Sequence, residues 1–138
     1  MFVDDIPQGL SAFLAALQAG DAVGAAAHIA EYVILETPID AAPIVGRDKV
    51  GSMLAAIFEV VDDVTVTEIL IGDGDFAVVT NARMGSEDLD GIDLIGINAE
   101  GKVASMTCHL RPMRAIVALQ NRLAALSGRP ALTLIEEP

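Results

Sequence analysis

Residues 36–50 read ETPIDAAPIVGRDKV and contain a change from an extended segment to a helix. The segment YVILETP, which leads into this stretch, is rich in β-branched and aromatic residues and stops at Pro38, as a short strand would. A loop carrying Asp40 and Pro43 follows. After Gly46, apolar residues recur at helical spacing, namely Val50, Met53, Leu54, Ile57, Phe58 and Val61. The stretch therefore predicts a strand, a loop and the start of a helix.

Two further helices are predicted before this strand. Apolar side chains at i, i+3, i+4 and i+7 form one stripe of an amphipathic helix, and these are Leu10, Phe13, Leu14 and Leu17. Gly20 is placed to end that helix, and Asp21 to cap the next one. The second helix is predicted over DAVGAAAHIAE, residues 21–31, whose alanines would allow close packing against a neighbour.

The second half of the chain is predicted to be mostly strand. Four β-rich segments lie between turn signals: VTVTEILIG (64–72), DFAVVTNARMG (75–85), LDGIDLIGIN (89–98) and KVASMTCHL (102–110). GDGD (72–75) and NAEGK (98–102) are typical hairpin turns, and the acidic run SEDLD (86–90) is interpreted as a solvated hairpin tip. Residues 111–128 return to a helical pattern, with Met113, Ile116, Val117, Gln120 and Leu123 on one side. This order predicts an α+β fold whose curved sheet wraps over helices and encloses a cavity.

Composition limits the classes of partner. With 138 residues, 53% of them hydrophobic, the chain fits one domain over residues 1–138, with a core at about 7–111 and a helix and tail at 112–138. The formal charge of -12 disfavours nucleic acid and anionic membrane surfaces. No targeting or membrane-spanning pattern is present, which predicts a cytoplasmic protein. One cysteine and two histidines provide no disulfide and no zinc spacing, so no metal and no cofactor are expected, although a site made of carboxylates alone stays open.

Five motifs carry a resemblance to a known superfamily: GD after the first helix, ETP, PIVGRDKV, GID and AEGKV. Together they resemble the nuclear transport factor 2-like superfamily, which includes ketosteroid isomerase, limonene epoxide hydrolase and the SnoaL-type polyketide cyclases. The match extends from about Leu10 to Arg111, and HLRPMRAIVAL resembles SnoaL-like proteins with an extra C-terminal helix. The resemblance implies a cone-shaped, mixed or antiparallel sheet around the N-terminal helices. It also implies a pocket at the wide end and a homodimer formed through the sheet.

Most of the ketosteroid isomerase site is replaced at the matching positions. Thr37 stands where that enzyme has its general base, and a threonine cannot take a proton from carbon at neutral pH. Phe13 and Leu54 stand where it has two tyrosines. Asp93 matches its second oxyanion donor, a carboxylic acid kept neutral by an apolar pocket. In the limonene epoxide hydrolase pattern Gly91 replaces the arginine, and Arg83 could substitute only if its side chain pointed inward.

Asp93 is the main candidate for chemistry. Apolar neighbours surround it on a strand, and a buried carboxylate must be paired, hydrogen-bonded or protonated. Its predicted role is acid, base or hydrogen-bond donor, and the alternative is a structural aspartate bound to a backbone or arginine partner. If Asp93 faces inward, Ile92 and Leu94 face the other side of the sheet, where a second copy of the chain would cover them.

The remaining candidates divide into a wall and a set of minor polar groups. The predicted ligand-binding wall consists of Phe13, Thr37, Leu54, Phe76, Val78, Met106, Cys108 and Leu110. In the register that the resemblance implies, the last strand turns Ala104, Met106, Cys108 and Leu110 inward and His109 outward. The minor candidates are His28, Asp40, Arg83 and His109.

Two function hypotheses follow from these residues. The first is a pocket protein that binds a small apolar molecule and acts as an isomerase, cyclase or hydrolase through Asp93, without a cofactor and without the standard ketosteroid isomerase mechanism. The second is a non-catalytic ligand-binding or dimeric assembly module of the same fold. The shortage of polar groups expected in the pocket favours the second, so the residues leave open whether the domain is an enzyme.

Overall fold

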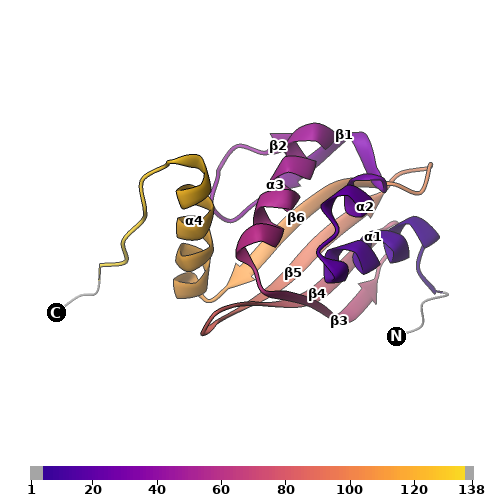
Figure 1. Ribbon diagram of the computed structural model, residues 1–138. Coiled ribbons are helices and arrows are strands. Elements are labelled where there is room, and N and C mark those ends of the chain that lie inside the picture. The colour runs from indigo at the N-terminus through magenta and orange to yellow at the C-terminus, as the bar shows by residue number, and fades with distance from the viewer. Residues whose placement is uncertain (1–4, 136–138) are drawn as a thin grey trace.

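The computed structural model describes residues 5–135 and shows helices packed on one curved sheet (Figure 1). The elements of this part of the chain are α1 (Gln8–Ala19), α2 (Ala22–Ala26), β1 (Ile29–Glu36), β2 (Ile44–Val45), α3 (Arg47–Val60), β3 (Asp63–Ile71), β4 (Asp75–Met84), β5 (Glu87–Ile97), β6 (Val103–Arg111) and α4 (Met113–Ser127). Gly20 ends α1 in the left-handed conformation that glycine adopts without strain. The predicted α+β class is confirmed.

The sheet is mixed, with the strand order β2-β1-β6-β5-β4-β3. β3 to β6 form an antiparallel meander, whereas β1 pairs with β6 in parallel and β2 pairs with β1 antiparallel. In Figure 1, α1, α2 and α3 lie across one face of this sheet and α4 stands beside α3. The opposite face of the sheet carries no helix among the described residues.

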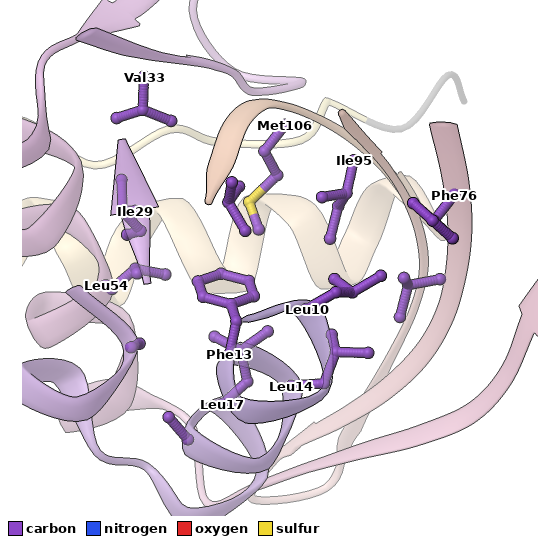
Figure 2. Close-up of a cluster of buried hydrophobic side chains, with 14 of the residues drawn as sticks. Leu10, Phe13, Leu14, Leu17, Ile29, Val33, Leu54, Phe76, Ile95 and Met106 are labelled. Carbon is purple, nitrogen blue, oxygen red and sulfur yellow. The ribbon is translucent and has the colours of Figure 1, made fainter. Parts of the chain in front are cut away.

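The main core lies between α1, α3 and the covered face of the sheet. The predicted stripe of α1 is fully used, since Leu10 and Phe13 are 0% exposed and Leu14 and Leu17 are buried. Figure 2 shows the Phe13 ring pointing from α1 toward Met106 of β6. A second, smaller cluster of buried residues joins α4 to the β4–β5 hairpin and consists of Met84, Leu89, Ala115 and Leu119.

The predicted second helix is too long. Asp21 caps α2 as expected, because its side chain accepts the Gly24 N–H at 2.9 Å. The helix nevertheless ends at Ala26, and the chain enters β1 at Ile29. From His28 onward the backbone groups pair with the sheet instead of continuing the helix. The Val103 N–H donates to the His28 carbonyl at 2.9 Å, and Ile29 is 1% exposed. Burial and pairing with β6 outweigh the helical propensity of the alanines.

Two local predictions in the loops are wrong. Ile44 and Val45 form the short strand β2, although the sequence predicts a loop up to the third helix. Of the run at 86–90, Ser86 lies in the exposed hairpin turn as predicted, but residues 87–90 form a paired strand in which Leu89 is buried. In both places the backbone N–H and C=O groups are hydrogen-bonded to a neighbouring strand, and the local sequence pattern does not show which strand will be the partner.

Helix α4 occurs where the pattern predicts it, but its buried face is centred elsewhere. Ala115, Leu119 and Ala124 are its buried residues, whereas Met113 is 69% exposed. The small Ala115 allows the helix to approach the sheet closely. The Arg122 Nη1 donates to the Val60 carbonyl at 2.8 Å and fixes α4 against the end of α3. Contacts with α3, β5 and β6 therefore set the rotation of this helix.

Candidate ligand pocket

A cavity of about 150 Å³ lies between α3, α4 and the covered face of the sheet. Most of its wall is aliphatic, and its polar members are few. The residues around it are Leu17, Leu35, Thr37, Pro38, Ile39, Asp40, Met53, Leu54, Ile57, Phe58, Val61, Val64, Thr80, Ala82, Leu89, Asp93, Met106, Cys108, Leu110, Leu119, Gln120 and Leu123. Such a wall suits a molecule that is mainly apolar and carries one or two hydrogen-bonding groups.

Asp93 is the buried carboxyl group of this wall, with an exposed fraction of 9%. In the sheet it lies directly opposite Val78 of β4 and Cys108 of β6, so its immediate cross-strand neighbours are one aliphatic group and one thiol. Burial raises the pKa of Asp93, while a hydrogen bond with the Cys108 thiol and the charge of His109 oppose that rise. Desolvation is the largest of these effects, so the neutral carboxylic acid is favoured.

Cys108 is held as a thiol. Burial is the main cause that raises its pKa, and the Asp93 charge and the hydrogen bond to Asp93 act in the same direction. A thiol with a raised pKa is a weak nucleophile, because the thiolate is the reactive form. Cys108 is therefore a hydrogen-bonding partner of Asp93 and not a second reactive group.

Gly91 leaves room on the pocket wall for the side chains of its neighbours, because it has no Cβ. A Cβ at position 91 would lie 2.7 Å from Leu110 Cδ2 and 3.1 Å from Thr80 Oγ1. Thr80 is the direct cross-strand neighbour of Gly91, and both Thr80 and Leu110 line the pocket. The glycine therefore allows these two side chains to close over β5 on the cavity side of the sheet.

Thr37 has its hydroxyl engaged with the backbone. Its Oγ1 accepts the N–H groups of Ile39 and Asp40, both at 3.3 Å, and so stabilises the turn after β1. This turn forms one edge of the pocket and places Asp40, which is solvent-exposed, at its rim. Thr37 thus shapes the pocket through its backbone turn.

A larger groove of about 580 Å³ runs between α3 and α4. It shares four residues with the pocket, namely Asp40, Met53, Gln120 and Leu123. Farther along it are Lys49, Ser52, Ser127 and Arg129. Since the two hollows have these walls in common, the groove adjoins the pocket where α3 and α4 face each other.

Residues 10–109 match the SnoaL-like domain family. The chain belongs to this family. The matched residues end before α4, so this helix, which lines one side of the pocket, lies outside them. No curated protein is significantly similar in sequence.

Solved structures similar to this SnoaL-like protein support the fold. An uncharacterized bacterial protein with a cystatin-like fold from Silicibacter pomeroyi has 23% identity and a TM-score of 0.84, over 91% of this chain and 89% of that one. A steroid delta-isomerase from Pseudomonas aeruginosa has 22% identity and a TM-score of 0.79, over 89% and 94%. A nuclear transport factor 2-like protein of unknown function from Cytophaga hutchinsonii has 13% identity and a TM-score of 0.66, over 78% and 91%. Together with the family match, these structures confirm the expected nuclear transport factor 2-like fold.

The SnoaL-like pocket contains only part of the predicted wall. Thr37, Leu54, Met106, Cys108 and Leu110 line it, as do Asp93 and Asp40. Phe13, Phe76 and Val78 do not, and their prediction as wall residues is wrong. They are packed in the main core instead (Figure 2 shows the first two), because α1 fills the part of the concave face that they occupy.

Three of the minor polar candidates lie away from the pocket. Arg83 points to solvent, where its Nη2 lies 3.9 Å from Asp63 Oδ2 and 60% of its side chain is exposed, so it cannot replace the missing arginine. His109 is exposed on the outer face, opposite Ile92, as its register predicts. His28 lies in the turn after α2 and not on a helix, because α2 ends early.

The last strand departs from strict alternation at one end. A register shift between Gly96 and Ile97 makes Val103 the buried residue at the start of β6, 1% exposed, whereas Ala104 is only half-buried. The predicted inward position of Ala104 is therefore wrong, since a bulge moves the pattern by one residue. From Met106 onward the predicted alternation returns.

Sequence reasoning missed the contribution of α4. Leu119, Gln120 and Leu123 of this helix line the pocket. The one sequence feature that could have indicated a pocket on this helix was Gln120, a polar residue within the otherwise apolar predicted stripe. No local pattern indicated that α4 folds back against α3. Among residues 5–135, no group of three or more His, Cys, Asp or Glu side chains could hold a metal ion. No helix in that range is long and apolar enough to cross a membrane.

Proposed function

We propose that this SnoaL-like protein binds a small, neutral and mainly apolar molecule in the pocket, with Asp93 as the group that recognises a ligand oxygen. The observation that carries this proposal is a carboxyl group in a largely aliphatic cavity, where burial raises its pKa. A neutral carboxylic acid can donate a hydrogen bond to a carbonyl or epoxide oxygen, which an ionised one cannot. The ligand class is therefore a lipophilic ketone, epoxide or related compound.

The size of the cavity restricts the part of the ligand that reaches Asp93. A cavity of about 150 Å³ admits a molecule of roughly the size of benzene. Ligand sites for larger molecules commonly have about 300–1,000 Å³. A ligand larger than a single ring would thus extend into the groove between α3 and α4.

The chemistry that Asp93 supports is donation of a hydrogen bond or proton. Negative charge that develops on a ligand oxygen would be stabilised by this donor in a site of low dielectric constant. An isomerisation, cyclisation or hydrolysis with such a step is the proposed enzymatic activity, without a cofactor. While it holds its proton, Asp93 cannot also accept one, and Thr37 at the family's base position cannot remove a proton from carbon.

Ligand screening and one substitution test this proposal. Lipophilic ketones and epoxides would be screened by thermal shift, and bound compounds followed by NMR for conversion. We expect Asp93→Leu, which removes the hydrogen-bond donor, to weaken binding and abolish conversion, while Asp88→Asn, which changes an exposed carboxylate on the same strand, leaves both unchanged. If both variants bind ligand as the wild type does and nothing is converted, Asp93 has no catalytic role.

A non-catalytic assembly module is the second candidate, and the outer face of the sheet favours it. Tyr32, Ile34, Ile92 and Leu94 are exposed there, Tyr32 by 78%. Exposed apolar patches of this kind commonly mark protein interfaces. We infer that a second copy of the chain covers this face and forms a homodimer through the sheet.

Light scattering tests the dimer directly. Ile92→Lys places a charge in the proposed interface and is expected to yield monomers, because an unpaired buried charge is costly. Val23→Lys is the matched control, since Val23 is 84% exposed on α2, on the helical side of the sheet. A monomeric wild type, or a dimer that survives Ile92→Lys, would contradict the inference.

A further inference from the structure

Gln120 occupies the boundary between the pocket and the α3–α4 groove. It belongs to the wall of both hollows and is half-buried. Its neighbours on α4 that also line the pocket are Leu119 and Leu123. One amide group is thus set among aliphatic side chains at the point where a ligand would leave the pocket.

The amide of Gln120 has no hydrogen bond to any residue within 5–135, whereas the amide of its neighbour Asn121 donates one and accepts one. Asn121 donates to the Leu132 carbonyl at 2.9 Å and accepts the Leu132 N–H at 2.7 Å, which fastens the C-terminal segment to α4. Every buried side-chain nitrogen and oxygen atom within 5–135 has a hydrogen-bond partner, so the unbonded amide of the half-buried Gln120 reaches solvent. Its groups are therefore available to a ligand, which would replace water there.

The helix that carries Gln120 is placed rigidly enough to recognise a ligand. Arg122 binds the Val60 carbonyl of α3 at 2.8 Å, and Leu119 is buried against the β4–β5 hairpin. Because α4 lies beyond residues 10–109, its contribution is not part of the matched SnoaL-like region.

We propose that Gln120 is a specificity-determining residue, and that the ligand carries two neutral hydrogen-bonding groups joined by an apolar body. One group, a carbonyl, meets Asp93 in the pocket, and the other, a hydroxyl, meets the Gln120 amide at the boundary with the groove. This inference rests on the proposed ligand-binding function of the pocket. A hydroxyl suits an amide because each can both donate and accept a hydrogen bond.

A neutral second group fits the charges around Gln120 better than an anionic one. Asp40 shares the same boundary, and the chain has a formal charge of -12. Lys49 and Arg129 lie in the groove, but Asp48 lies there with them. A carboxylate placed at this boundary would share it with the Asp40 carboxylate, and like charges repel.

A series of paired probes tests the proposal over a range of spacings between the two groups. The probes are 2-alkanones of about five to nine carbons, a range that brackets the size of the cavity, and the corresponding ketones with a terminal hydroxyl. Titration calorimetry measures the affinity ratio of each hydroxyketone to its ketone. In the wild type we expect the hydroxyl to improve affinity about three- to tenfold at one or two chain lengths, as one neutral hydrogen bond would.

Substitution of the amide should remove this ratio selectively. Gln120→Met keeps the length and shape of the side chain but removes the hydrogen-bonding groups, so the ratio should fall to about one. Gln8→Met is the matched control, because Gln8 is exposed on α1, and the wild-type ratio should persist. Gln120→Asn, a shorter amide, should restore a preference at a different chain length and provides a second readout if the methionine variant is unstable.

The outcomes separate this inference from the proposed function. Ketones that bind without any gain from the hydroxyl, or a gain that survives Gln120→Met, would overturn the role of Gln120 and leave the pocket proposal standing. If neither probe series binds the wild type, the proposed ligand class fails and the inference with it. A gain lost in Gln120→Met and kept in Gln8→Met supports it.

Discussion

Replacing Asp93 by asparagine should change how the stability of the protein depends on pH. Asparagine has nearly the same shape and remains neutral, and its side-chain carbonyl can still accept from the Cys108 thiol. At low pH, where Asp93 is protonated in both states, the variant and the wild type differ only in local contacts. Above the ordinary pKa of 3.8 the unfolded chain releases this proton while the folded protein keeps it, because burial raises the pKa of Asp93. The wild type therefore loses stability as pH rises from that value to the folded pKa.

The size of the effect follows from one proton. Over that interval the free energy of unfolding of the wild type should decline, relative to Asp93→Asn, by up to about 1.4 kcal/mol per pH unit. Above the folded pKa both states are ionised and the difference becomes constant. The variant is thus expected to be more stable than the wild type at neutral pH, although it loses a charged residue.

Urea unfolding at a series of pH values measures this difference. Comparison of the two proteins at each pH cancels the contributions of the other carboxylates. Asp88→Asn removes one exposed carboxylate from the same strand and controls for the change in net charge. A difference between Asp93→Asn and the wild type that stays constant from pH 4 to pH 8 would refute the argument, because it would mean that folding does not perturb Asp93.

Two further substitutions distinguish core from pocket. Phe13→Ala should lower the free energy of unfolding by about 3–5 kcal/mol in urea titrations, because Phe13 is 0% exposed in the main core; a loss below about 1 kcal/mol would contradict this packing. Gly91→Ala should displace the Leu110 side chain on the pocket wall, since the new Cβ would lie 2.7 Å from its Cδ2, and should weaken ketone binding in calorimetry; because the end of a flexible side chain can move, the stability cost should be only about 1 kcal/mol. Unchanged ketone affinity in a folded Gly91→Ala protein would show that this part of the wall does not contact the ligand.

The inward position of Asp93 could be read from the sequence because a strand alternates with period two. Asp93 and Ile95 are buried, while Ile92 and Leu94 between them are exposed. The same rule placed His109 outside. It failed at Ala104, where a bulge between β5 and β6 shifts the pattern, since the position of an extra residue depends on the partner strand and not on the local sequence.

Phe13, Phe76 and Val78 illustrate a second limit. Their inward direction was predictable, but whether an inward side chain meets a cavity or another side chain depends on which helix lies above it. Here Leu10, Phe13 and Leu14 of α1 belong to the same buried cluster as Phe76 and Val78, so this part of the concave face is solid core. The cavity remains only where α3 and α4 stand over the sheet.

The sequence by itself therefore determined the class of fold, the order of the elements and the carboxyl group that faces inward, because each depends on local periodicity and on motifs along the chain. Only the tertiary structure decided that β1 joins β6 in parallel, that β2 exists and that Gln120 of α4 lies on the pocket wall. These features depend on contacts between segments far apart in the chain, such as Arg122 with Val60. Periodicity within one segment carries no information about its partner.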